Sequence, residues 1–162
     1  MGRGKILLLA TGIFIADRLI KIWVAHTLTL GQSITVMPGL LWITYIVNQG
    51  AAFGLFPNAT PVFIAVAVVL LGMVAVTLWR YARFSRLSGW GIGLLAGGAL
   101  GNLWDRVVSG QVIDYIHVRD YAIFNLADSA IVVGMIFWVA DQWRNDRRID
   151  QSDSAGERHD RS

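Results

Sequence analysis

Four apolar stretches, each about as long as a membrane-spanning helix, dominate this sequence of 162 residues. A helix needs about 20 predominantly apolar residues to cross the hydrocarbon core of a bilayer. Apolar residues make up 55% of the chain and charged residues only 15%, against about 25% in an average soluble domain. We therefore expect an all-α membrane protein with four transmembrane helices, at Ile6–Leu28, Pro61–Tyr81, Gly89–Val108 and Ala122–Trp143.

Basic residues at the ends of these stretches predict their direction across the membrane. Lysine and arginine are enriched in cytoplasmic connections. Arg3 and Lys5 precede the first stretch, and two further groups separate the second from the third and follow the fourth: Arg80, Arg83, Arg86, Arg144, Arg147 and Arg148. Both termini are therefore predicted to be cytoplasmic. These short clusters form no continuous basic stripe, so the net charge of +3 does not indicate a nucleic-acid partner.

The long connection between the first two stretches, residues 29–60, contains no charged residue. Its segment Leu41–Val47 has the β-branched and aromatic content of a strand, which predicts a small extracytoplasmic β-sheet on the outer membrane surface. After Trp143 the sequence becomes charged and polar without apolar periodicity. We therefore expect a four-helix transmembrane domain over residues 1–143, which includes the outer segment 29–60, and a disordered cytoplasmic tail over residues 144–162.

Acidic residues of three stretches fall at similar depths. With a rise of about 1.5 Å per residue, Asp17, Asp105 and Asp128 all lie roughly 18–24 Å above the cytoplasmic flank of their helices. An ionisable group at this depth costs at least about 2.5 kcal/mol, so it normally faces the interior of the helix bundle and marks function. The glycine row Gly89, Gly93, Gly97 and Gly101 predicts a closely packed neighbouring helix along the face that leads to Asp105.

Amides and further charges share helix faces with these acids, because residues three or four apart are neighbours on a helix. Asn102 lies with Asp105 and Arg106, Asn125 with Asp128, and Asp17 with Lys21. Structural interpretations stay open at this point, namely buried ion pairs that brace helices, and for Asp128 a favourable charge at a helix N-terminus. The chain has no cysteine, and its three histidines are too scattered to suggest a metal site, so we expect neither metal nor cofactor.

Five blocks of the sequence, in order, resemble the lipoprotein signal peptidases, also called signal peptidase II. They are ADRLIK (16–21), NQGAAFG (48–54), GGALGNLWDRV (97–107), VIDYI (112–116) and FNLADSAI (124–131). One departure is Arg18, where the family commonly carries glutamine.

This resemblance implies an aspartic peptidase of the bacterial plasma membrane that removes signal peptides from prolipoproteins, cutting before the diacylglyceryl-modified cysteine. Membrane lipid and the inhibitor globomycin are further partners that it implies. By position in the blocks, the catalytic aspartates are Asp114 and Asp128. The other polar positions around the active site are Asp17, Asn48, Asn102, Asp105, Arg106 and Asn125.

A carboxyl pair suits amide hydrolysis in a chain without cysteine. Two neighbouring carboxyl groups cannot easily both ionise, so one acts as a base toward water while the other donates a hydrogen bond to the developing oxyanion. We expect Arg106 to pair with Asp105 or a substrate carbonyl, and the outer segment with Phe53 and Phe56 to clamp the substrate. The alternatives are a small proton- or ion-coupled transporter, which also places polar groups within spans, and a noncatalytic assembly factor.

Overall fold

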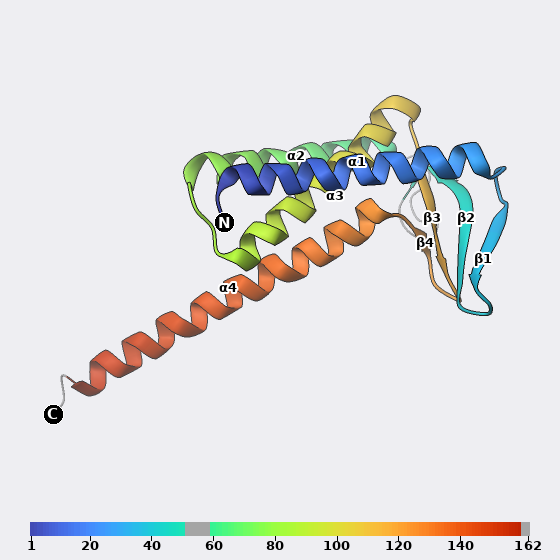
Figure 1. Cartoon of the computed structure of the whole chain (residues 1–162). Helices are drawn as coiled ribbons and strands as arrows, with labels where there is room; N and C mark the ends of the chain where they lie inside the picture. The colour runs from blue at the N-terminus through green and yellow to red at the C-terminus, as the bar shows by residue number, and fades with distance from the viewer. Residues whose placement is uncertain (51–58, 160–162) are drawn as a thin grey trace.

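Over residues 1–50 and 59–159, the computed structural model contains four helices and a four-stranded antiparallel sheet (Figure 1). The elements in chain order are α1 Arg3–Thr27, β1 Ser33–Met37, β2 Leu41–Asn48, α2 Thr60–Arg80, α3 Arg86–Ser109, β3 Val112–Val118, β4 Ile123–Phe124 and α4 Leu126–His159. All four predicted helices are present. Phe53 and Phe56 lie outside the described residues.

Helix α3 is packed between α1 and α4, and glycines allow both contacts. Gly97, in the predicted glycine row, faces α1, where an added Cβ would lie 2.6 Å from the carbonyl oxygen of Ala10. Gly91 faces α4, where an added Cβ would lie 2.8 Å from the carbonyl oxygen of Gly134. The close contact on the α1 side was therefore predicted, whereas the second glycine face, which contacts α4, was not.

Helix α2 has the strongest membrane character. None of its residues is buried, although its sequence is almost entirely apolar. By length and composition, α2 and the segment Leu126–Asn145 of α4 are apolar enough to cross a membrane. In α1 the charged residues Asp17, Arg18 and Lys21 reduce this character, and in α3 the many glycines do so.

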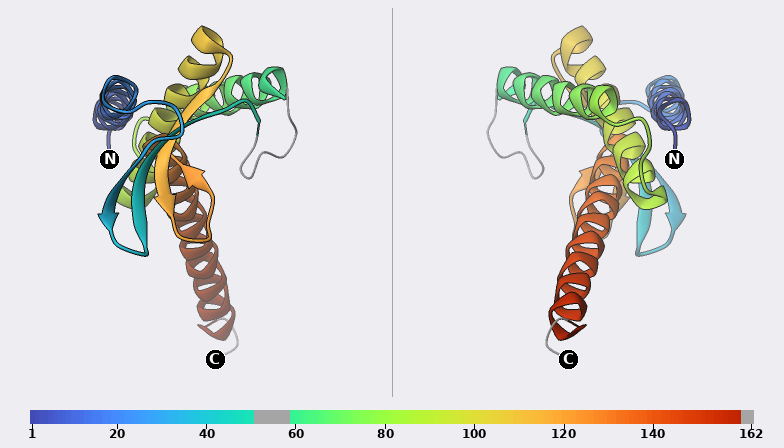
Figure 2. Two further views of the ribbon diagram at one scale, coloured as in Figure 1. Left: turned by 90° about the vertical axis from the view of Figure 1, so that its right-hand side faces the viewer. Right: turned by 90° about the vertical axis from the view of Figure 1, so that its left-hand side faces the viewer.

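The sheet lies at one end of the helices, next to the C-terminal end of α1 and the beginning of α4 (Figures 1 and 2). Its strand order is β1-β2-β3-β4, and β2 confirms the strand predicted at Leu41–Val47. A cluster formed by Val24, Leu28 and Tyr115 packs the sheet against α1.

Both ends of the fourth helix differ from the prediction. The helix begins at Leu126 rather than Ala122, because Ile123 and Phe124 pair with β3 as strand β4. It continues to His159, whereas disorder was expected after Trp143. Extending an existing helix avoids the cost of nucleation, and the segment contains no proline before its end.

Gly98, like Gly91, lies on the face of α3 that packs against α4, and this close packing predicts a measurable loss of stability from one added methyl group. Gly98→Ala places a Cβ against the carbonyl oxygen of Ala127, so we expect it to lower the free energy of unfolding by about 1–3 kcal/mol. Gly72→Ala in α2, where an added Cβ meets nothing within 4 Å, is the matched control. Thermal unfolding in detergent compares them, and equal stability of the two variants would contradict the packing described.

Candidate active site

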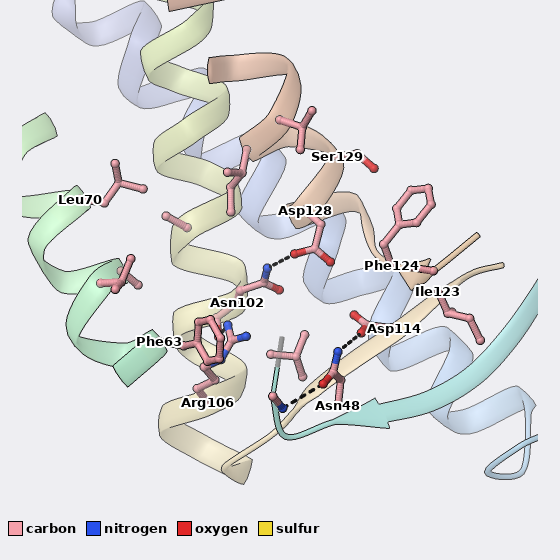
Figure 3. A pocket seen from close by; sticks show the side chains of 18 of the residues that line it. Asn48, Phe63, Leu70, Asn102, Arg106, Asp114, Ile123, Phe124, Asp128 and Ser129 are labelled. Atoms are coloured by element: carbon pink, nitrogen blue, oxygen red, sulfur yellow. Dashed lines mark hydrogen bonds between the residues drawn. The ribbon is translucent and has the colours of Figure 1, made fainter. Parts of the chain in front are cut away.

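A cavity of about 680 Å³ opens between α2, α3, α4 and strands β3 and β4 (Figure 3). Its walls are mostly apolar and include Val66, Leu70 and Val132. Five of the predicted site residues line it: Asn48, Asn102, Arg106, Asp114 and Asp128. The polar residues of four separate elements therefore meet at one apolar cavity.

The carboxyl of Asp114 is held by the end of the neighbouring strand. Asp114 is buried in β3, opposite Ile46 of β2. Asn48, the last residue of β2, donates from Nδ2 to Asp114 Oδ2 at 3.0 Å. The Asn48 Oδ1 accepts from the backbone N–H of Gly50 at 2.9 Å, so the amide has its NH₂ group directed at Asp114.

Asp128 is fixed by the cap of helix α4. Asn125, the residue before the helix, accepts at Oδ1 from the Asp128 backbone N–H at 2.8 Å. In return, Asp128 Oδ2 accepts from the Asn125 backbone N–H at 3.2 Å. This reciprocal arrangement is a capping box with aspartate in the position usually taken by glutamate. It holds the Asp128 carboxyl at the beginning of α4.

Asn125 also connects the two carboxyl groups. Its Nδ2 donates to Asp114 Oδ1 at 2.7 Å, while its backbone N–H contacts Asp128. Asn102 donates from Nδ2 to Asp128 Oδ1 at 2.6 Å. Figure 3 shows the two carboxyl groups projecting toward one another from β3 and α4. Each therefore accepts two N–H groups while facing the other across the cavity.

The surroundings of Asp114 favour its protonated form. Burial, and after it the negative charge of Asp128, raises the pKa of the Asp114 carboxyl from 3.8 to about 6. Hydrogen bonds from Asn48 and Asn125 and the positive charge of Lys21 act in the opposite direction. Near neutral pH a proton can thus be gained or lost at this site at little cost.

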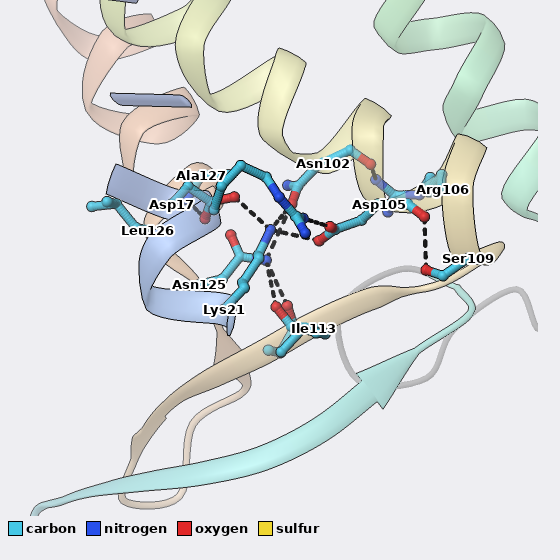
Figure 4. Close-up of polar contacts among 12 residues, drawn as sticks. Asp17, Lys21, Asn102, Asp105, Arg106, Ser109, Ile113, Asn125, Leu126 and Ala127 are labelled. Atoms are coloured by element: carbon cyan, nitrogen blue, oxygen red, sulfur yellow. Dashed lines mark hydrogen bonds and ion pairs between the residues drawn. The ribbon is translucent and has the colours of Figure 1, made fainter. Parts of the chain in front are cut away.

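A second polar layer lies behind the cavity (Figure 4). Lys21 Nζ is 2.7 Å from both Asp17 Oδ2 and Asp105 Oδ2, and Arg18 pairs with Asp105 Oδ1. We call these four residues the charge cluster, which contains two acids and two bases. None of the four is among the described residues that line the cavity. Lys21 also donates to Asn102 Oδ1 at 3.2 Å, which joins the charge cluster to the cavity.

Comparisons with known proteins decide the family. Residues 9–144 match the family model described as signal peptidase (SPase) II. The lipoprotein signal peptidase of Geobacter metallireducens is 43% identical over 141 residues, which cover 83% of this chain and 87% of that protein. That of Desulfitobacterium hafniense is 40% identical over 120 residues, 74% of this chain and 80% of that protein. The chain belongs to the signal peptidase II family.

A solved structure described as a bacterial membrane enzyme is 31% identical, with a TM-score of 0.83 over 90% of this chain and 94% of that one. As a signal peptidase II, the protein is an aspartic peptidase that removes signal peptides from prolipoproteins. The comparisons give no support to the alternative of an ion-coupled transporter.

One of the two partners predicted for Arg106 in this signal peptidase is wrong. Arg106 does not pair with Asp105, because successive helix residues point about 100° apart. Asp105 turns toward α1, whereas the Arg106 guanidinium lies 4.9 Å from the ring centroid of Phe63 in α2. Arg18 was not predicted as the partner of Asp105, and no pattern in the sequence marked Phe63. The i, i+4 spacing of Asp17 and Lys21 did indicate their ion pair.

The raised pKa of Asp114 predicts a pH-dependent contribution to stability. Between about pH 4 and 6 the folded protein binds more protons at Asp114 than the unfolded chain does, so this contribution falls as the pH rises. Relative to the wild type, Asp114→Asn is expected to gain about 1–3 kcal/mol in unfolding free energy between pH 4 and 7.

Denaturant titrations in detergent at several pH values measure this difference. Asp120→Asn is the control, because the Asp120 side chain in the β3–β4 turn is 90% exposed. Parallel stability curves for Asp114→Asn and the wild type would show that Asp114 is not perturbed in the folded protein.

Proposed function

We propose that Asp114 and Asp128 are the catalytic pair of this signal peptidase. The observation that carries the proposal is the contact of Asn125 with both carboxyl groups, at 2.7 Å to Asp114 and 3.2 Å to Asp128. Both residues line the same cavity and face one another within it. Their hydrogen-bond partners at this site are amides, which leave the carboxyl groups free to share a proton.

In the proposed reaction the pair holds one proton and a water molecule. The ionised carboxyl accepts a proton from the water molecule while the water oxygen attacks the scissile carbonyl carbon. The protonated carboxyl donates a hydrogen bond to the developing oxyanion, and a proton then passes to the leaving amine as the C–N bond breaks. Asn48, Asn102 and Asn125 keep the two acids in position without neutralising them.

The cavity walls suit a lipid-modified substrate. Apolar side chains of α2 and α4 form much of the lining, and the Arg106 guanidinium is the charged donor beside them. We propose that the apolar walls contact the diacylglyceryl group and the signal helix, and that Arg106 donates to a backbone carbonyl next to the lipidated cysteine. Asp17 and Asp105 support the site from behind. A globomycin-type inhibitor would occupy the same cavity.

The proposed topology has four transmembrane helices in the bacterial plasma membrane. The helices contain between 21 and 34 residues, which is long enough to span a bilayer. Basic residues at the end opposite the sheet support cytoplasmic termini and an outer sheet. The active site would then lie near the outer leaflet.

Single cysteines test this topology cleanly, because the chain contains no cysteine of its own. Arg119→Cys, at the end of β3 next to the sheet, is expected to react with a membrane-impermeant maleimide in intact spheroplasts. Arg83→Cys, in the α2–α3 connection, is expected to react only after permeabilisation. Labelling of Arg83→Cys in intact spheroplasts would show that the helices cross the membrane in the direction opposite to the one proposed.

Catalysis by the pair predicts severe losses from two conservative substitutions. Asp114→Asn and Asp128→Asn should each reduce cleavage of a diacylglyceryl-modified precursor at least about 100-fold, because each removes a proton donor or acceptor. Asp120→Asn, the exposed acid of the same sheet, should retain wild-type cleavage. Product analysis by mass spectrometry reads out the assay, with an unmodified precursor as a second substrate.

Retained cleavage by a folded Asp114→Asn or Asp128→Asn protein would rule out the pair. Equal cleavage of modified and unmodified precursors would instead refute the proposed contact of the cavity with lipid.

A further inference from the structure

Lys21 is a completely buried lysine that the proposed mechanism does not use. Its exposed fraction is 0%, and its ammonium contacts Asp17 and Asp105 at 2.7 Å and Asn102 Oδ1 at 3.2 Å. The first two contacts balance charge. The third is directed at the amide that also binds Asp128, so Lys21 is separated from a proposed catalytic carboxyl by a single side chain.

The ammonium group determines how the Asn102 amide is oriented. An ammonium can only donate hydrogen bonds, so Asn102 must turn its oxygen toward Lys21 and its NH₂ group away from it. That oxygen also accepts from Asn125 Nδ2 at 3.2 Å. The NH₂ group is thereby directed at Asp128 Oδ1, 2.6 Å away. In the opposite orientation, the Asn102 side-chain oxygen would face the Asp128 carboxyl oxygen, and the Asn102 NH₂ group would face the Lys21 ammonium.

We propose that Lys21 is a positioning residue for the peptidase reaction: it holds Asn102 as a hydrogen-bond donor to Asp128, and its charge stabilises the single negative charge of the aspartate pair. This inference rests on the proposed catalytic role of Asp114 and Asp128. A brace between α1 and α3 would need only the ion pair of Lys21 with Asp105, and the contact with Asn102 adds a link to the catalytic pair.

Other charged and titratable groups around the pair play different parts. Arg106 of α3 faces the pair from the cavity side, where substrate binds. Tyr115 of β3 stays protonated, because burial raises its pKa, and its hydroxyl accepts from the Leu126 N–H at 3.1 Å. The charge of Lys21 lowers the pKa of Asp114, as expected for a cation close to the pair. Within the charge cluster, Lys21 is thus the cation that contacts Asn102.

The test compares two substitutions that remove one positive charge each from the charge cluster. Lys21→Met removes the contact with Asn102, whereas Arg18→Met leaves that contact in place because Arg18 pairs only with Asp105 among the described residues. Both proteins are assayed for kcat and KM on the diacylglyceryl-modified precursor across the pH range. Thermal unfolding in detergent records the stability of each.

For Lys21→Met we expect kcat to fall about 10- to 100-fold with little change in KM, because the Asp128 carboxyl loses its fixed donor. The acidic limb of the pH profile should move to higher pH, by on the order of one unit, because the negative charge of the pair becomes less favourable. Arg18→Met should lower stability but leave the acidic limb in place.

A charge-balanced variant covers the case in which Lys21→Met fails to fold. Asp17→Asn combined with Lys21→Met removes one acid and one base, and the amide introduced at position 17 retains an oxygen for the Ala127 N–H, which Asp17 binds at 3.2 Å. The same loss of kcat is expected, with a smaller shift of the limb, because one negative charge is removed together with the positive charge.

Three results would overturn the inference: wild-type kcat in the charge-balanced variant, an unmoved acidic limb in Lys21→Met, or an equal shift in Arg18→Met. Failure of the catalytic pair itself would appear separately, as cleavage by Asp128→Asn.

Discussion

The first backbone N–H groups of helix α4 have no partners within the helix, and Ala127 is completely buried there, so the partners must come from elsewhere in the protein. Strand β3, helix α1 and the cap residue Asn125 supply them. The Leu126 N–H donates to the Tyr115 hydroxyl of β3, the Ala127 N–H to Asp17 of α1, and the Asp128 N–H to the Asn125 side chain. These bonds fix α4 against α1 and the sheet, and they place Asp128 at the point where the elements meet. Helix capping and assembly of the site are therefore one arrangement.

Charge at the site is divided between two layers. The charge cluster behind the cavity contains two acids and two bases, so each buried charge has an opposite neighbour. In front of it, Asn102 and Asn125 separate these charges from Asp114 and Asp128. A carboxylate in direct contact with an arginine or lysine would be held ionised. Amide neighbours leave the front pair able to exchange a proton, which general acid–base chemistry requires.

The helices were predictable because apolar length and glycine spacing are local properties of the sequence. Contacts between elements were less so: periodicity groups Asn102, Asp105 and Arg106 on one side of α3, yet Asp105 pairs with α1 and Arg106 faces α2. The short strand β4 was taken for helix because the apolar residues 122–124 suit either structure, and only pairing with β3 decides between them. The resemblance to the family identified Asp114 and Asp128 as a pair. Their hydrogen bonds could not be predicted in this way, because they depend on the β2–β3 register and the α4 cap.

One acid of the pair comes from a strand and the other from a helix end, and the chemistry gives a reason for this division. Hydrolysis needs water, which the interior of a bilayer does not supply, while a signal helix needs an apolar surface. Strand β3, which contains Asp114, lies at the end of the helices where α4 begins (Figure 1). Helix α4 presents Asp128 at its first turn and continues as an apolar wall of the cavity. The junction of sheet and helix thus places the two carboxyl groups beside an apolar wall, as the proposed function requires.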